Sequence, residues 1–333
     1  MNKWQYLCGI FLLLTIAACK TPATKQPPAA FPNARELVEL NQLVYMEPLK
    51  DSLAGKAPEY ELVYQPAASV NGNFAFIAKR KDSLQYALVI RGSVIEFSND
   101  GFQNFILQDF NVFNQKKWDY ADTVKEAYIS RGTYLGFQNL LQLRDGASGL
   151  SLYDFISQKI PAQASLVVTG HSLGGNLAYP MAGFLQKKFG SSGKIRFQLI
   201  TFGAPAAGNA AFVQDLEEKF PDAERYVIDR DIAPAFPDPG RVGDIAKILG
   251  LDKALKIKGF ELDASDLMSI AGELLEKVNV INESNKYVQS QRHLRSLRSA
   301  DTLAPGTDLS AEALFSRAYL FHRVDAYAAL LKK

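Results

Sequence analysis

The sequence predicts an α/β fold with a mostly parallel central sheet and helices on both faces. Short apolar runs rich in β-branched residues alternate along the chain with longer segments of helical composition, a pattern typical of parallel strands joined by helices. With 47% hydrophobic and 22% charged residues, the 333-residue chain has the composition of a globular protein with a sizeable core. Its formal net charge of +2 does not point to nucleic acid as a partner.

The first elements are expected to lead into the sheet. Residues 36–46 predict an opening helix, and residues 73–80 and 85–91 predict two strands joined as a hairpin by residues 81–84. A phenylalanine-rich stretch at 102–113 follows, with aromatic residues at helical spacing, and its role stays open.

Strand and helix signals then alternate through the middle of the chain. Ser165–Thr169 predicts a buried strand, and the helical composition of residues 173–189 ends at Gly190, a residue type that often follows a helix. The other expected elements are helices at 136–143, 151–159 and 209–220 and strands at 197–202 and 225–229.

Residues 240–315 interrupt this alternation. Segments 245–258 and 265–280 have apolar residues along one face and predict amphipathic helices. We expect a helical insertion within a single domain of residues 33–333, rather than a second domain.

The amino terminus resembles a bacterial lipoprotein signal. Residues 1–18 combine a positive start, an apolar stretch and small residues before Cys19, and in such signals the cysteine is acylated. Residues 19–32 are rich in proline and predict an extended tether. The expected location is therefore an outer membrane or cell surface, through lipidated Cys19; a plain signal peptide is the alternative.

A Gly-x-Ser-x-Gly turn centred on Ser172 joins the predicted strand at 165–169 to the helix at 173–189. In a strained strand-to-helix turn of this kind the serine hydroxyl stands above the sheet, and the flanking positions, Gly170 and Gly174, must lack side chains. The strand before and the helix after favour a nucleophilic serine. An incidental serine in an ordinary turn is the alternative.

A nucleophilic serine needs a histidine base, and the chain has three histidines. His171 lies inside the turn, where its side chain is expected to point away from the task of Ser172. His293 stands in a basic run that is typical of a surface. His322 follows the serine near the end of the chain and is the candidate base.

The histidine in turn needs an orienting acid, which is expected at the carboxyl end of a strand. Asp229 and Asp231 both follow the apolar run at 226–228. Asp231 opens a proline-containing turn at 231–237, yet spacing alone leaves the two aspartates nearly even.

Several short motifs follow one another in order: Ala87–Ser93, Gly136-Phe137, Val168–Gly175, Thr201–Asn209, Asp231–Pro237 and His322–Tyr327. In this order the chain resembles the class 3 lipases, the fungal-type group with the α/β-hydrolase fold. The family carries an amphipathic lid near the place of residues 94–113, so that these residues are either lid or core.

The resemblance implies a triad of Ser172, Asp231 and His322. It selects Asp231 because the family's acid precedes Ile or Val, any residue and Pro. It also implies an oxyanion hole formed by the backbone N–H of Leu173 and by Ser93; a plain turn serine is the alternative for Ser93. No metal or organic cofactor is expected.

The predicted function is a serine carboxylic-ester hydrolase, a membrane-tethered lipase acting on acylglycerols or related lipids. Short-chain esterase, phospholipase and feruloyl-type esterase are alternatives among enzymes, and a catalytically silent lipoprotein that binds lipid or a partner is the alternative outside them. The expected partners are an ester substrate and, through Cys19, a membrane, with no nucleic acid and with the oligomeric state open.

Overall fold

The computed structural model describes residues 30–68, 72–92, 114–122, 124–238, 241, 255–257, 260–262, 286–299 and 319–332. The predicted signal peptide, Cys19, Ser93, the stretch 94–113 and the predicted helix at 265–280 lie outside these residues. Among the described residues, no helix has the length and apolar character needed to cross a membrane.

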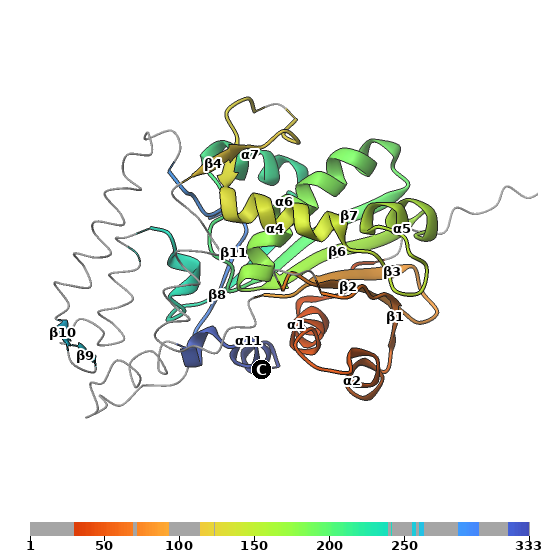
Figure 1. The fold of residues 1–333 in the computed structure, drawn as a ribbon, viewed down its shortest axis with the longest axis horizontal. Coiled ribbons are helices and arrows are strands. Elements are labelled where there is room, and N and C mark those ends of the chain that lie inside the picture. The colour runs from red at the N-terminus through yellow and green to blue at the C-terminus, as the bar shows by residue number, and fades with distance from the viewer. Residues whose placement is uncertain are drawn as a thin grey trace, which may run out of the picture.

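A seven-stranded sheet forms the centre of the fold (Figure 1). The first three strands pair antiparallel with one another, and the remaining strands continue from β3 in parallel. The predicted hairpin at 73–91 and the mostly parallel sheet are confirmed. In spatial order the strands are β1 (Tyr60–Tyr64), β2 (Ala75–Arg80), β3 (Gln85–Ile90), β6 (Ala164–His171), β7 (Ile195–Phe202), β8 (Glu224–Ile228) and β11 (Leu294–Leu297).

Helices cover both faces of this sheet, as predicted (Figure 1). Alternate residues of β6 enter two separate apolar clusters, Leu166 and Val168 on one face and Val167 on the other, because successive side chains of a strand point to opposite sides. One face carries α4 (Arg131–Gln142), α5 (Leu152–Lys159), α6 (Leu173–Phe189) and α7 (Ala210–Lys219); the other carries α1 (Ala34–Leu43), α2 (Leu49–Lys56) and α11 (Val324–Leu331).

The segment that precedes α1 is attached where the parallel strands begin. The hydroxyl of Ser165, at the start of β6, donates to the carbonyl oxygen of Ala30 at 2.7 Å. The guanidinium carbon of Arg196, at the start of β7, lies 4.8 Å from the centre of the Phe31 ring. The chain therefore joins the sheet at the end of β6 opposite Ser172.

The predicted helical insertion at 240–315 contains strands in two places. Residues 294–297 form β11, an edge strand parallel to β8. Residues 255–257, expected to end a helix, form β9, which pairs antiparallel with β10 (Phe260–Leu262). β11 has two polar residues between its two leucines, so that its sequence lacks the apolar run typical of a buried strand. An edge position tolerates the polar residues because only one side of the strand is paired.

Two smaller features complete the described fold. Gly190 has φ −62° and continues α6 into the short 3₁₀ turn Gly190–Ser192, so that the left-handed residue is Gly193, at φ +60°. The predicted end of the helix is confirmed, because α6 ends at Phe189 and Gly190 follows it. β4 (Gln115–Lys117) and β5 (Tyr128–Ser130) form a separate antiparallel pair.

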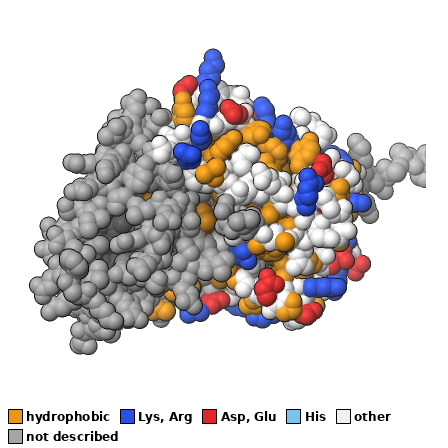
Figure 2. Space-filling view, in the orientation of Figure 1, with side chains coloured by type: hydrophobic (Ala, Val, Ile, Leu, Met, Phe, Trp, Pro, Cys, Tyr) orange, Lys and Arg blue, Asp and Glu red, His pale blue; other side chains and the backbone are white. Residues whose placement is uncertain are grey.

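On the face shown in Figure 2, Lys and Arg side chains are interspersed with acidic and apolar ones. Among the described residues of this face, charges of one sign therefore form no continuous patch of the kind that attracts polyanions.

Candidate active site

Ser172 alone separates β6 from α6. Its backbone has φ +59° and ψ −129°, a strained conformation for a residue with a side chain. A Cβ on Gly170 would lie 2.2 Å from the carbonyl carbon of Gly174, and a Cβ on Gly174 would lie 2.1 Å from the carbonyl oxygen of Ile90. Both positions therefore require glycine for the strand, the turn and the helix to pack this closely.

His322 lies beside this serine, just before α11. Its Nε2 is 2.7 Å from Oγ of Ser172, and the two side chains are buried, with 3% and 6% of their residues' surface exposed. His293, the other candidate base, is buried under α7 and not on the surface as predicted. Burial lowers the pKa of His293, which stands at the start of β11 and away from the serine.

Asp231 completes the arrangement from the turn after β8. Its carboxylate oxygens lie 2.9 and 3.0 Å from Nδ1 of His322, and it is fully buried. The N–H of Ala233 donates to the same carboxylate at 2.9 Å. Asp229 is exposed and accepts from the N–H of Ser299. The structure thus brings Ser172, His322 and Asp231 together and leaves Asp229 outside.

Residues 90–240 match the family lipase (class 3). This part of the chain has the sequence of a class 3 lipase. The protein is accordingly a lipase-type carboxylic ester hydrolase. The matched segment contains Ser172 and Asp231 but ends before His322. The place of His322 in the site is shown by its distances to those two residues.

The chain is similar to solved lipase structures, and M37 lipase shares its fold. M37 lipase is 21% identical, with a TM-score of 0.69 over 91% of this chain and 94% of that chain. Lipase II from Rhizopus niveus is 18% identical, with a TM-score of 0.49 over 62% of this chain and 74% of that chain. The likeness to M37 lipase and the mostly parallel sheet give the chain the α/β-hydrolase fold.

Tyr327 also lies in the site of this lipase. The sequence included it in the motif His322–Tyr327 but indicated no role for it. Its hydroxyl donates to Oδ2 of Asp231 at 2.6 Å and accepts from the N–H of Ile228 at 3.2 Å. Burial, and then the charge of Asp231, raise the pKa of Tyr327 well above its usual range. The Asp-x-Tyr spacing after His322 was the signal that pointed to this position.

His171 is the second residue whose contact the sequence did not reveal. Its side chain is predicted to point away from the task of Ser172, and its ring centre lies 4.8 Å from that of His322. Its Nε2 is 2.6 Å from the carbonyl oxygen of His322. The lipase therefore has two adjacent histidines beside one serine.

The predicted oxyanion residues are Leu173 and Ser93. Leu173 begins α6 directly after Ser172, where helical N–H groups lack intrahelical partners. Ser93 lies outside the described residues, but its neighbour Gly92 is packed against the turn. A Cβ on Gly92 would lie 3.4 Å from Cβ of Ser172, and the N–H of Gly92 donates to the hydroxyl of Tyr45 at 3.1 Å.

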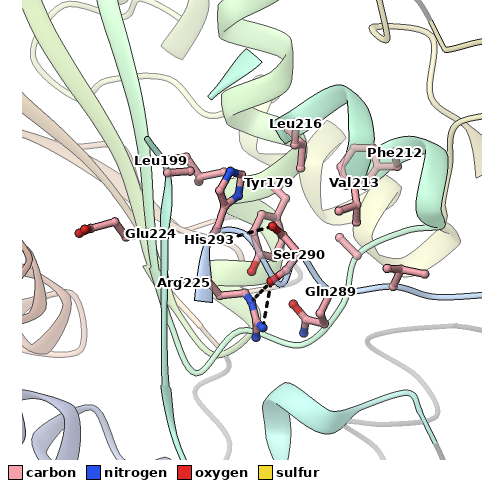
Figure 3. A pocket seen from close by; sticks show the side chains of 13 residues that line it. Tyr179, Leu199, Phe212, Val213, Leu216, Glu224, Arg225, Gln289, Ser290 and His293 are labelled. Carbon is pink, nitrogen blue, oxygen red and sulfur yellow. Dashed lines mark hydrogen bonds between the residues drawn. The ribbon is translucent and has the colours of Figure 1, made fainter. Parts of the chain in front are cut away.

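The cavity in Figure 3 lies apart from the Ser172 site. Apolar side chains from α6, α7 and β7 line it together with Arg225 and His293. Arg225 donates through Nε and Nη2 to the carbonyl oxygen of Ser290, which fastens the segment before β11 to β8. Within the described part of the chain, no group of three or more His, Cys, Asp or Glu side chains could hold a metal ion.

Proposed function

We propose that this lipase hydrolyses carboxylic esters of lipids through an acyl-enzyme formed on Ser172. The observation that carries the proposal is the chain of two hydrogen bonds, 2.7 Å from Ser172 to His322 and 2.9 Å from His322 to Asp231. This order of nucleophile, base and acid supplies what acyl transfer to water requires.

In the first half-reaction, Oγ of Ser172 attacks the ester carbonyl carbon while Nε2 of His322 takes the hydroxyl proton. The resulting imidazolium is stabilised by Asp231 through Nδ1. The N–H of Leu173 and Ser93 stabilise the negative charge on the carbonyl oxygen by donating hydrogen bonds to it. When the C–O bond breaks, His322 returns its proton to the leaving alcohol and the acyl group remains on Ser172.

In the second half-reaction, water takes the place of the alcohol. His322 removes a proton from water, the hydroxide oxygen bonds to the acyl carbon, and the bond to Oγ of Ser172 breaks. The proton then passes from His322 to Oγ, which releases a carboxylic acid and restores the enzyme. Throughout both half-reactions Asp231 orients the imidazole and does not take the proton itself.

A reactive-serine probe tests the role of Ser172. A fluorophosphonate is expected to label the wild-type protein and to leave Ser172→Ala unlabelled, although Ser172→Ala keeps the same circular dichroism spectrum. Folded wild-type protein that fails to label would contradict the proposal.

An apolar acyl chain is supported by the match of residues 90–240 to the family lipase (class 3). p-Nitrophenyl esters of increasing chain length, assayed below and above micelle formation, test this. We expect kcat/KM to rise with chain length and with the micellar interface; activity confined to short soluble esters would instead favour an esterase.

We also propose that the lipase is tethered to a membrane through acylated Cys19. The support is the sequence pattern of residues 1–19 and the proline-rich segment that follows. The wild-type protein should incorporate radiolabelled palmitate and should sediment with membranes. Cys19→Ala should incorporate no label and should remain in the soluble fraction. Equal partitioning of the two proteins would overturn the tether and leave the hydrolase proposal intact.

A further inference from the structure

His171 contacts the proposed base and not the proposed nucleophile. Its Nε2 lies 2.6 Å from the carbonyl oxygen of His322, and the two rings are 4.8 Å apart at an interplanar angle of 35°. The ring of Tyr327 packs against its edge at 5.8 Å. His171 is therefore enclosed by the element that carries the base.

The carbonyl contact assigns the tautomer of His171. A carbonyl oxygen accepts only, so Nε2 of His171 must carry the hydrogen and Nδ1 must hold the lone pair. Among the described residues, Nδ1 has no hydrogen-bond partner. Burial, and then the neighbouring His322, hold the pKa of His171 well below its usual range, which keeps the ring neutral.

We infer that His171 is a positioning residue for the proposed reaction: it holds the main chain and the ring of His322 in line with Ser172. The inference rests on the proposed function. The side chain of His322 is held at Nδ1 by Asp231, but that bond alone lets the ring pivot about the carboxylate. The bond from His171 to the carbonyl of the same residue adds a second fixed point.

The chemistry of the site explains why a neutral histidine suits this position. His322 becomes an imidazolium while the acyl-enzyme forms, and a second cation in contact with it would oppose that charge. Neutral His171 offers an N–H donor to the main chain with no added charge. Its Nε2 is also committed to a carbonyl, so that it cannot compete for the proton of Ser172.

Two substitutions separate the hydrogen bond from the volume of the ring. His171→Gln keeps an N–H donor at nearly the same reach as Nε2, whereas His171→Leu keeps apolar volume and loses the donor. Misplacement of a reacting group by about 1 Å can cost roughly 100-fold in rate. We expect kcat of His171→Leu to fall by about 10- to 100-fold with KM within about two-fold, and His171→Gln to recover most of the loss.

Fluorophosphonate inactivation measures the same effect on a single step. The maximal rate of labelling, kinact, should fall in His171→Leu while the half-saturating probe concentration stays unchanged, at temperatures where the variant is folded. If His171→Leu fails to fold, His171→Asn takes its place, because its shorter amide does not reach the carbonyl of His322; it should react slowly where His171→Gln reacts normally.

The outcomes separate this inference from the proposed function. A wild-type protein that does not label removes the proposed function itself. Wild-type labelling with unchanged kinact in the folded Leu or Asn variant overturns the positioning role, as does a rise in KM with kcat unaltered. The positioning role is also overturned if all His171 variants, His171→Gln included, lose the same stability and keep the same kcat.

Discussion

The hydroxyl of Tyr327 donates a 2.6 Å hydrogen bond to Oδ2 of Asp231, the oxygen that also lies 2.9 Å from Nδ1 of His322. Two side chains therefore contact the same oxygen of this buried carboxylate. Because the raised pKa keeps Tyr327 protonated, this arrangement exists before any substrate binds and persists across the neutral pH range.

Tyr327→Phe removes that donor and keeps the buried ring. We expect kcat to fall about ten-fold, equivalent to ~1.4 kcal/mol, because Asp231 gains freedom to turn away from His322. The free energy of unfolding should fall by about 1–3 kcal/mol, since a buried charged acceptor loses a partner. Ester hydrolysis and urea unfolding measure the two effects, and an unchanged kcat would show that His322 and Ala233 suffice to orient the acid.

Asp231→Asn should reduce kcat by about 10³- to 10⁴-fold, because an amide can hold His322 in the tautomer that cannot accept the serine proton. Asp229→Asn is the matched control, since Asp229 is exposed and bonded to a backbone N–H. Its kcat should stay within about two-fold of wild type. Equal losses in the two variants would remove Asp231 from its assigned role.

Ser172→Gly should be more stable than Ser172→Ala, although neither variant retains the hydroxyl. Glycine adopts φ +59° and ψ −129° without the strain that a Cβ introduces. Relief of about 1–3 kcal/mol of strain outweighs the extra unfolded-state entropy of glycine, about 0.5–1 kcal/mol. Chemical denaturation of the two inactive proteins tests this, and equal stability would mean that the turn is unstrained.

The depressed pKa of His171 predicts an acid-dependent loss of stability. The unfolded chain binds a proton at this residue near pH ~6.5, whereas the folded state, where burial and His322 lower the pKa, does not. Stability is therefore complete above about pH 6.5 and falls below it, by at most ~1.4 kcal/mol per pH unit for one proton.

His171→Gln should flatten this slope between about pH 6.5 and 5. His293, whose pKa is also lowered, contributes in the same direction, so the slope should decrease and not vanish. Urea unfolding at several pH values measures both proteins, and a variant that keeps the full wild-type slope would exclude His171 as its source.

The local elements of the site could be predicted because their signals are contiguous. The strand, the turn and the helix around Ser172 occupy one stretch, and Gly170 and Gly174 are required there by backbone packing alone. The choice between Asp229 and Asp231, by contrast, could not be made from a local signal. Spacing left both open, the family resemblance selected Asp231, and the structure places that carboxylate against His322.

The contacts of His171 and Tyr327 could not be predicted from local pattern. The first joins residues 151 positions apart and the second joins residues 96 positions apart, so that neither leaves a periodic trace in the sequence. β11 was missed for a related reason: its pairing with β8 comes from a sheet edge, where burial on one side does not impose a continuous apolar run.

The attachment of Ala30 and Phe31 at the start of β6 and β7 determines how the molecule faces a support. β6 has 8 residues, so its two ends lie about 25 Å apart at roughly 3.3 Å per residue. A resin, an electrode or a fusion partner joined to the amino-terminal side would meet one end of the sheet. Ser172 would lie at the other end, away from the support.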